Sequence, residues 1–165
     1  GRNAWALHEG RPAIEEAIRY LRAAKPQAPL VLAEGMSLGA DDLVRDQGPR
    51  GEVGHAGSDG SGVGDRLRRY GLWAGRAAEL VQYGADSARE IVGLLLVDDG
   101  VPDRGHRLVL FDGGYRVMGV AIGSHARNRT MCVITLANEY QEGYAVPDAF
   151  MDQGRARGRS GSWGR

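Results

Sequence analysis

Ten residues with the sequence DDGVPDRGHR, residues 98–107, follow directly on the apolar run of residues 91–97. They place two adjacent carboxylates, a proline-containing turn, one histidine and two arginines in a single short segment. An abrupt change from apolar to ionisable residues is typical of a rigid element that ends beside a binding or catalytic loop. A charged surface turn is the alternative interpretation of the same residues. Only functional residues elsewhere in the chain that could lie near this segment can decide between a site and a surface turn.

Helical periodicity dominates the first part of the chain. Residues 4–24 carry apolar side chains at helical spacing, with Pro12 suited to the first turn. A second helix is expected to begin with Ser37 as its N-cap and to stop at Gly48. Two further helices are expected over residues 65–71 and 87–97, the latter capped by Asp86 or Ser87.

Three segments rich in apolar and β-branched residues predict strands. They are residues 76–83, 115–123 and 130–137. The short polar segment between the last two predicts an antiparallel hairpin. One face of the first hairpin strand carries Gly119, Ala121 and Gly123, so we expect another backbone to pack closely against it.

The composition is that of a globular domain without a strong electrostatic field. Hydrophobic residues make up 42% of the chain and charged residues 25%, and 21 basic side chains balance 21 acidic ones. This balance gives no reason to expect nucleic acid as a partner. The 26 glycines argue against an all-helical bundle, because glycine favours turns and close backbone contacts.

The length of the chain and its targeting signals limit the possible domain organisation. A chain of 165 residues predicts one domain, over residues 1–150, and the basic, glycine- and arginine-rich residues 151–165 predict a flexible tail. The single cysteine, Cys132, rules out an internal disulfide. No run approaches the roughly 20 apolar residues of a membrane-spanning helix. The chain lacks both an initiator methionine and a signal peptide, which is consistent with an export signal removed by processing.

A glycine-rich loop over residues 48–64 carries further polar residues. Its composition is typical of a flexible linker. Because helix-forming sequence follows directly, we expect the loop to lie inside the domain instead. No Gly-Lys-Ser or Gly-Lys-Thr follows, so the loop does not match a phosphate-binding Walker motif.

Five motifs follow one another in a fixed order over roughly residues 10–138. They are GHAGSDGS (54–61), DRLRRYG (65–71), AELVQYG (78–84), RGHR (104–107), and the strand pair YRVMGVAIG and MCVITLA (115–123 and 131–137). Together they resemble the CAP superfamily, also called SCP-like domains, and its bacterial branch in particular. The resemblance implies an α/β fold, a three-layer α/β/α sandwich with a central antiparallel sheet.

The resemblance also implies a cleft that gathers two histidines and two acidic residues. His55 takes the first histidine position and His106 the second. Glu79 stands where the family usually has the glutamate of a Gly-Glu-Asn run, although its neighbours differ. Asp98 takes the fourth position, with Asp99 as a near-equal candidate.

This set of ligands suits zinc or another divalent metal ion with an open coordination position. Two alternatives stay open: His55 as a loop histidine bonded to nearby backbone, and Glu79 paired with an arginine such as Arg107. The rim of the same cleft is expected to include Ser58, Asp59, Asp99 and Arg107. Capping of the following helix is the alternative role for Ser58 and Asp59.

Two functions remain from these observations. The first is a binding module, secreted or located in the envelope, whose cleft holds a metal ion or small ligand or whose surface binds a lipid or protein. The second is a metal-dependent hydrolase in which Glu79 or Asp98 serves as general base. The chain has no nucleophile elbow and no HExxH motif, so we favour the binding module. Localisation is expected to be extracellular or periplasmic.

Overall fold

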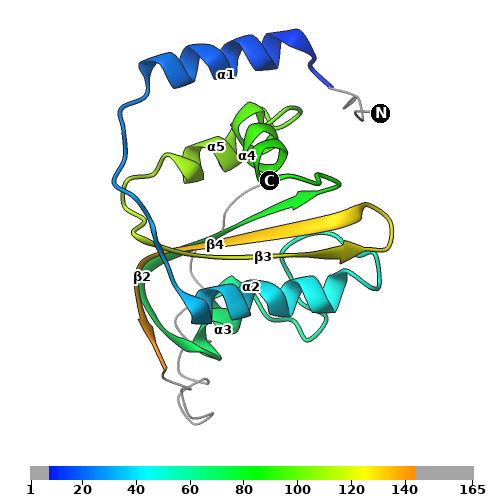
Figure 1. Ribbon diagram of the computed structural model, residues 1–165, viewed down its shortest axis with the longest axis vertical. Helices are drawn as coiled ribbons and strands as arrows, with labels where there is room; N and C mark the ends of the chain where they lie inside the picture. Colours follow the sequence, from blue (N-terminus) through cyan, green and yellow to red (C-terminus); the bar gives the residue numbers. More distant parts are fainter. Residues whose placement is uncertain (1–7, 144–165) are drawn as a thin grey trace.

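A four-stranded sheet forms the middle layer of the structure, a computed structural model that describes residues 8–143 (Figure 1). The strand order is β1-β3-β4-β2, and the strands are β1 (Val31–Leu32), β2 (Gly71–Tyr83), β3 (Val117–His125) and β4 (Arg129–Glu142). β3 and β4 form the predicted antiparallel hairpin, and β2 pairs antiparallel with the other side of β4. The short β1 departs from the expected pattern because it pairs parallel with β3.

Helices cover both faces of this sheet (Figure 1). One layer holds α1 (Arg11–Ala23), α4 (Ala88–Val97) and α5 (Gly105–Leu110), and the other holds α2 (Glu34–Gln47) and α3 (Val63–Arg68). The predicted three-layer α/β/α sandwich is therefore confirmed. Within residues 8–143 no helix is both long and apolar enough to cross a membrane. The predicted domain boundary at residue 150 and the predicted tail lie outside the described residues.

β4 is the central strand, and it is buried on both faces over residues 131–137. Ile134 and Leu136 belong to the core that includes Leu95 of α4. Met131 and Val133, on the alternate face, belong to the core that includes residues of α2. An uninterrupted apolar run is what a strand covered by helices on both sides requires. Cys132 lies in this run, and burial raises the pKa of its thiol to about 11.

The small residues of β3 allow α2 to approach the sheet closely. A Cβ atom at Gly119 would lie 2.2 Å from the carbonyl carbon of Met36, and one at Gly123 would lie 2.5 Å from a methyl carbon of Val44. Both distances are far below van der Waals contact. The predicted close backbone packing on this face of β3 is confirmed.

The start of α2 is set by a distant residue, and the predicted N-cap at Ser37 is wrong. The helix begins one turn earlier, at Glu34. The carboxylate of Glu142, at the end of β4, accepts hydrogen bonds from the amides of Glu34 (2.5 Å) and Gly35 (3.1 Å). Glu142 thus satisfies the free amides of the first turn. The Ser37 hydroxyl instead donates to the carbonyl of Ala33, inside the helix.

Other element boundaries also differ from the sequence prediction. α1 begins at Arg11 rather than at residue 4, and the preceding Gly10 has a φ of 75°, which is not helical. Pro12 does occupy the first turn, and Ser87 does cap α4 by accepting from the amide of Glu90. β2 is longer than predicted and continues through an irregularity between Ala74 and Ala77.

Ion pairs tie α1 to the segment between α4 and α5. Arg104 pairs with both Glu9 and Glu16, and Arg107 pairs with Glu16 at 2.7 Å. Tyr20 of α1 makes an edge-to-face contact with Phe111, with ring centroids 5.2 Å apart. Because Ile14, Ile18 and Leu21 are each more than one-third exposed, apolar burial holds α1 only in part. The ion pairs therefore add to the attachment that the buried Ala13 and Ala17 provide.

Acid should loosen α1 before it unfolds the rest of the domain. The hydrogen bond from Arg104 lowers the pKa of Glu9 from 4.5 to about 2, and the pKa of Glu16 is also lowered, first by Arg104 and then by Arg107. A carboxyl whose pKa falls on folding stabilises the fold above its unfolded pKa, and this contribution is lost as the pH falls toward the folded pKa. We expect amide exchange protection in α1 to drop between pH 4.5 and about 2 while protection in β4 persists. A Glu9→Gln variant should weaken this pH dependence, and equal loss of protection in both elements would contradict it.

Candidate functional site

The first histidine–carboxylate pair joins the glycine-rich loop to β2. Nδ1 of His55 lies 3.0 Å from Oε1 of Glu79. The Glu79 side chain is 2% exposed, whereas that of His55 is 58% exposed. A buried carboxylate at one ring nitrogen orients the imidazole and leaves Nε2 available. The side chain of His55 is therefore not the backbone-bonded loop histidine of the alternative interpretation.

A buried arginine completes this pair. One terminal nitrogen of Arg66, in α3, lies 2.6 Å from Oε2 of Glu79 and also donates to the carbonyl of His55 at 3.2 Å. The other donates to the carbonyl of Ser61 at 2.8 Å. Glu79 is thus paired with Arg66 and not with Arg107. Arg66 is absent from the site residues that the sequence predicts, because nothing in DRLRRYG distinguishes it from the arginines beside it.

The second pair lies where α4 ends and α5 begins. Oδ1 of Asp98 lies 2.6 Å from Nδ1 of His106, and Oδ2 accepts the backbone amide of His106 at 2.9 Å. The Asp98 side chain is 3% exposed and the His106 side chain 32%. The predicted loop around His106 is in fact the first turn of α5. One carboxylate therefore both caps α5 and orients its imidazole.

The structure separates the two adjacent aspartates. Asp98 ends α4 in the left-handed region, with φ 52° and ψ 45°, and this conformation turns its carboxylate toward α5. Asp99 accepts hydrogen bonds from the backbone amides of His8 and Glu9, before α1. Asp98 is the partner of His106, whereas Asp99 fastens the chain ahead of α1.

The side chain of Arg107 lies against the C-terminal end of α4 rather than beside an imidazole. Its side chain is 2% exposed, and its guanidinium donates to the carbonyls of Leu96 (2.5 Å) and Val97 (3.0 Å) and to Glu16 (2.7 Å). These bonds satisfy carbonyls in the last turn of α4. A cation at this end of a helix also interacts favourably with the helix dipole. Arg107 thus joins three helices of one layer.

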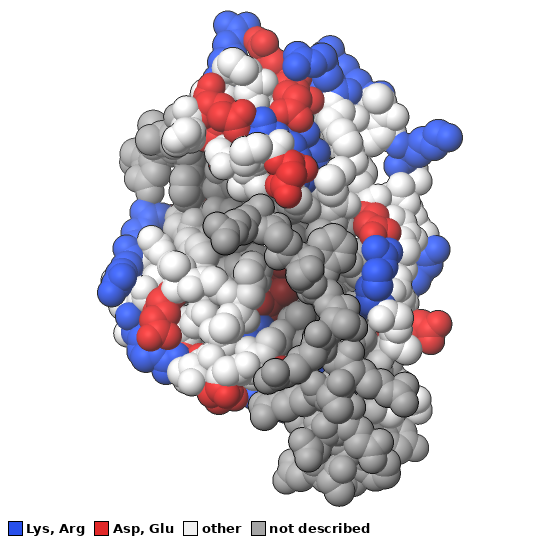
Figure 2. Space-filling view, turned by 180° about the vertical axis from the view of Figure 1, so that it is seen from behind, with Lys and Arg blue, Asp and Glu red and all other residues white. Residues whose placement is uncertain are grey.

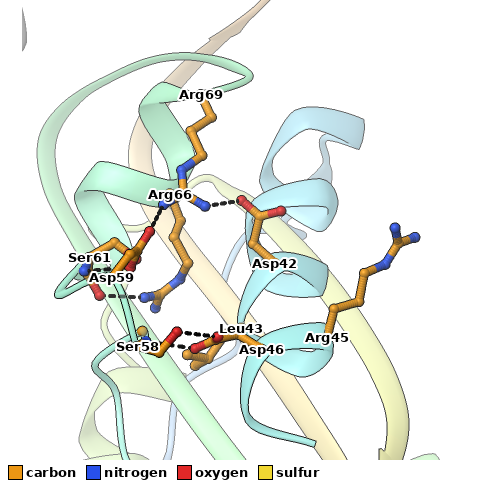
Figure 3. Close-up of a pocket in the computed structure, with 10 residues that line it drawn as sticks. Asp42, Leu43, Arg45, Asp46, Ser58, Asp59, Ser61, Arg66 and Arg69 are labelled. Atoms are coloured by element: carbon orange, nitrogen blue, oxygen red, sulfur yellow. Dashed lines mark hydrogen bonds and ion pairs between the residues drawn. The ribbon is translucent and has the colours of Figure 1, made fainter. Parts of the chain in front are cut away.

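Ser58 and Asp59 lie on the other side of the sheet, at a pocket between α2 and α3 (Figure 3). The amide and hydroxyl of Ser58 donate to Asp46 of α2 at 2.7 and 2.6 Å. Asp59 accepts the amide of Ser61 and pairs with Arg69, and hydrogen bonds from Ser61 and then Arg69 lower its pKa to about 2. Both residues thus anchor the glycine-rich loop and line a pocket.

The two histidine–carboxylate pairs belong to different layers. Ala77 and Val81, on the same face of β2 as Glu79, pack with the α2 and α3 layer. Asp98 and His106 belong to the α4 and α5 layer. β2, an edge strand, runs between these layers, and no hydrogen bond joins the two pairs within residues 8–143. Among the described side chains, no group of three or more histidines, cysteines or acids could hold a metal ion.

The family of the chain follows from its sequence as a whole. A model of the cysteine-rich secretory protein family, CAP, matches residues 15–137. The chain belongs to the CAP family. No curated protein matches the chain. The match includes both histidine–carboxylate pairs and the pocket at Ser58, so all three are features of this CAP domain.

Solved structures of bacterial proteins share the fold of this CAP domain. An extracellular protein from Bacillus anthracis that contains an SCP domain is 16% identical, with a TM-score of 0.55 over 78% of this chain and 40% of that one. An outer surface protein from Borrelia burgdorferi is 15% identical, with a TM-score of 0.49 over 76% of this chain and 86% of that one. This CAP domain thus spans less than half of the Bacillus protein. At such identities the first likeness supports the fold alone.

The surface of the CAP domain carries both signs of charge. On the face that Figure 2 shows, arginine and lysine side chains lie beside aspartates and glutamates rather than in a field of one sign. The ion pairs of Arg11 with Glu15, Arg45 with Asp41 and Arg129 with Asp86 follow the same pattern. The face shown therefore has no field of a single sign.

Proposed function

We propose that this CAP domain is a binding module whose two histidine–carboxylate pairs receive a divalent metal ion, such as zinc, or a small ligand. The observation that supports the proposal is the same in both pairs: a nearly buried carboxylate holds Nδ1 of a partly exposed imidazole. Neither Nε2 atom hydrogen-bonds to a described residue. Metal-ligating histidines are commonly held in this way by an outer carboxylate.

The donor chemistry fits a weakly held ion better than a structural one. Nε2 of His55 and Nε2 of His106 would be the protein ligands, because Glu79 and Asp98 use their oxygens to hold the imidazoles and the arginine. A bound zinc ion would supply a Lewis acid with positions left for exchangeable ligands. Structural zinc sites, by contrast, use four protein ligands.

The same contacts favour binding over hydrolysis. The Glu79 and Asp98 side chains are only 2% and 3% exposed and hold the imidazoles, which favours a supporting role over that of a general base in contact with a substrate water. No hydroxyl or thiol of residues 8–143 hydrogen-bonds to the ring of His55 or His106. A nucleophile activated by an adjacent imidazole would need such a contact.

We place this module outside the cell or in the periplasm, where a small ligand, a lipid or a protein would be its partner. The similar Bacillus anthracis protein is extracellular. The family to which the chain belongs is named for secretory proteins. A free cysteine is compatible with an oxidising compartment when it is buried, as Cys132 is.

Calorimetric titration with zinc tests the metal proposal. We expect the wild type to take up zinc, and we expect His55→Ala and His106→Ala each to remove part of this uptake, since each removes the imidazole ligand of one pair. His8→Ala is the matched control, because His8 is exposed and outside both pairs. The control should bind zinc like the wild type.

Each other outcome has a distinct meaning. If one single variant removes all of the uptake, that pair alone binds the ion; if each removes only part and the double variant removes all of it, each pair binds an ion separately. If the double variant binds zinc like the wild type, the proposed site is wrong.

A further inference from the structure

A polar pocket of about 290 Å³ lies between α2, the glycine-rich loop and α3 (Figure 3). Asp42 and Asp46 line it from α2, Ser58 and Asp59 from the loop, and Arg66 and Arg69 from α3. The pocket lies in a different place from the α4 and α5 layer that carries His106. Its walls bear both carboxylates and guanidinium groups, so its chemistry is that of a site for a charged, polar ligand.

The carboxylates of this pocket are held in place by neighbours. Asp42 accepts from Arg69 and from the Tyr70 hydroxyl, at 2.6 and 2.8 Å. Burial acts to raise the pKa of Asp46, but hydrogen bonds from Ser58 and Arg50 hold that pKa below its ordinary value. A carboxylate can accept about four hydrogen bonds. These acids are therefore fixed and charged, and they can still accept from a ligand.

Arg66 supplies an unused donor at the same pocket. Its side chain is 1% exposed, and its terminal nitrogens are all engaged with Ser61, His55 and Glu79. Its Nε atom is the one buried side-chain nitrogen or oxygen of the described residues that has no hydrogen-bond partner. Figure 3 shows this side chain extending from α3 to the level of Ser58 and Asp46. A buried N–H group without an acceptor destabilises the fold. An oxygen atom of a bound ligand that accepts from this N–H would therefore be favourable.

We propose that this pocket binds a small zwitterion of the amino-acid type. The ligand's carboxylate accepts from Nε of Arg66, and its ammonium group faces the carboxylates of Asp42 and Asp46. This site is distinct from the metal or small-ligand function proposed above, because it uses neither imidazole, although Arg66 also holds Glu79.

Charge balance favours a zwitterion over a simple ion. The positive charge of Arg66 is already balanced by Glu79 at 2.6 Å. Arg69 is shared between Asp42 and Asp59, and Arg50 is shared between Asp46 and Glu52, so each of these guanidinium groups serves two carboxylates. A lone anion would therefore add to a local excess of negative charge. A lone cation would leave Nε of Arg66 without an acceptor. A zwitterion satisfies both requirements and adds no net charge.

Three matched probes test the proposal by ¹⁵N NMR of the full chain. The probes are L-alanine, propionate, which lacks the ammonium group, and ethylammonium, which lacks the carboxylate. We expect L-alanine to shift the Nε–H resonance of Arg66 and the amide of Ser58 in a saturable way. At the same concentrations, propionate and ethylammonium should bind at least about tenfold more weakly, because each loses one charge-assisted contact.

Two variants connect the binding to the pocket. Arg66→Lys keeps a positive charge near Glu79 but has no Nε–H, so affinity for L-alanine should fall at least about tenfold. Ser58→Phe fills the pocket from the exposed loop and should abolish the shifts even if Arg66→Lys fails to fold. Arg11→Lys, on exposed α1, is the control and should bind like the wild type.

The proposal is overturned if L-alanine produces no saturable shift, or if Ser58→Phe binds it like the wild type. Equal binding of propionate would mean a simple anion site and would overturn the assignment to a zwitterion. None of these outcomes depends on zinc uptake, so the two sites fail or succeed separately.

Discussion

Replacing Asp98 with alanine should lower the free energy of unfolding by about 3 kcal/mol. The buried carboxylate accepts from the ring and the amide of His106, and a third, longer bond comes from the amide of Arg107. Alanine removes the carboxylate that accepts the first amides of α5 and leaves these donors without an acceptor. Alanine also tolerates a φ of 52° poorly, which adds strain. Urea unfolding monitored by circular dichroism measures the loss.

An Asp98→Asn variant keeps the shape of the side chain and removes its negative charge. Asparagine adopts the left-handed conformation readily and its side-chain oxygen still caps a helix. We therefore expect a loss of about 1 kcal/mol, well below that of alanine. The zinc affinity of Asp98→Asn should fall as well, because an amide holds the imidazole of His106 less firmly than a carboxylate does. Equal losses of stability for alanine and asparagine would contradict the capping role of Asp98.

Replacing Arg66 with methionine should lower the free energy of unfolding by about 4 kcal/mol. Arg66 and Glu79 form an ion pair in which the side chains are 1% and 2% exposed. Removing one partner leaves the other as an uncompensated buried charge. The same variant also releases the carbonyls of His55 and Ser61, which fix the glycine-rich loop. Urea unfolding again provides the measurement.

A double-mutant cycle isolates the ion pair. Glu79→Leu alone should cost a similar amount, because it strands the guanidinium of Arg66. The combined variant, Arg66→Met with Glu79→Leu, should cost clearly less than the sum of the two, since no buried charge remains. Arg11→Met is the surface control: Arg11 is 87% exposed in its pair with Glu15, and its loss should stay within about 0.5 kcal/mol. Additive losses at Arg66 and Glu79 would contradict a coupled pair.

The elements that could be predicted are those defined by local signals. α4 combines a serine cap with a broad apolar face, and β3 and β4 combine apolar residues with a short polar connection. Each of these signals lies within a few residues of the element that it specifies. The sandwich itself was predicted from the resemblance of the ordered motifs to the CAP family.

The predicted start of α2 was wrong because it is set by a residue far away in the sequence. The amides that begin α2 bond to Glu142, and no pattern near Glu34 reveals such a distant cap. The helix α5 was missed for another reason, since Asp98, which accepts the amide of His106, lies only eight residues before it. The residues around His106 were interpreted as a loop.

The residues of the candidate site could be predicted, but not how they pair. The resemblance to the CAP family assigned His55, Glu79, Asp98 and His106 to one cleft, and the structure pairs His55 with Glu79 and Asp98 with His106. Glu79 lies on the face of β2 that packs against α2 and α3, and this face determines the layer to which its pair with His55 belongs. Arg66 could not be predicted, because its role arises from burial against Glu79, and burial of one arginine among several is a property of the folded chain.

The position of β4 also has a consequence for synthesis of the protein. β4 is the last of the described elements in the chain, yet it is the strand partner of β2 and the main strand partner of β3, which otherwise pairs only with the two-residue β1. While the chain emerges from the ribosome, β2 has no strand partner until β4 has been made, and α2 lacks the carboxylate of Glu142 for as long. Most of the sheet must therefore form after translation of β4 rather than strand by strand. A nascent chain halted before β4 would expose apolar strand surface that chaperones bind.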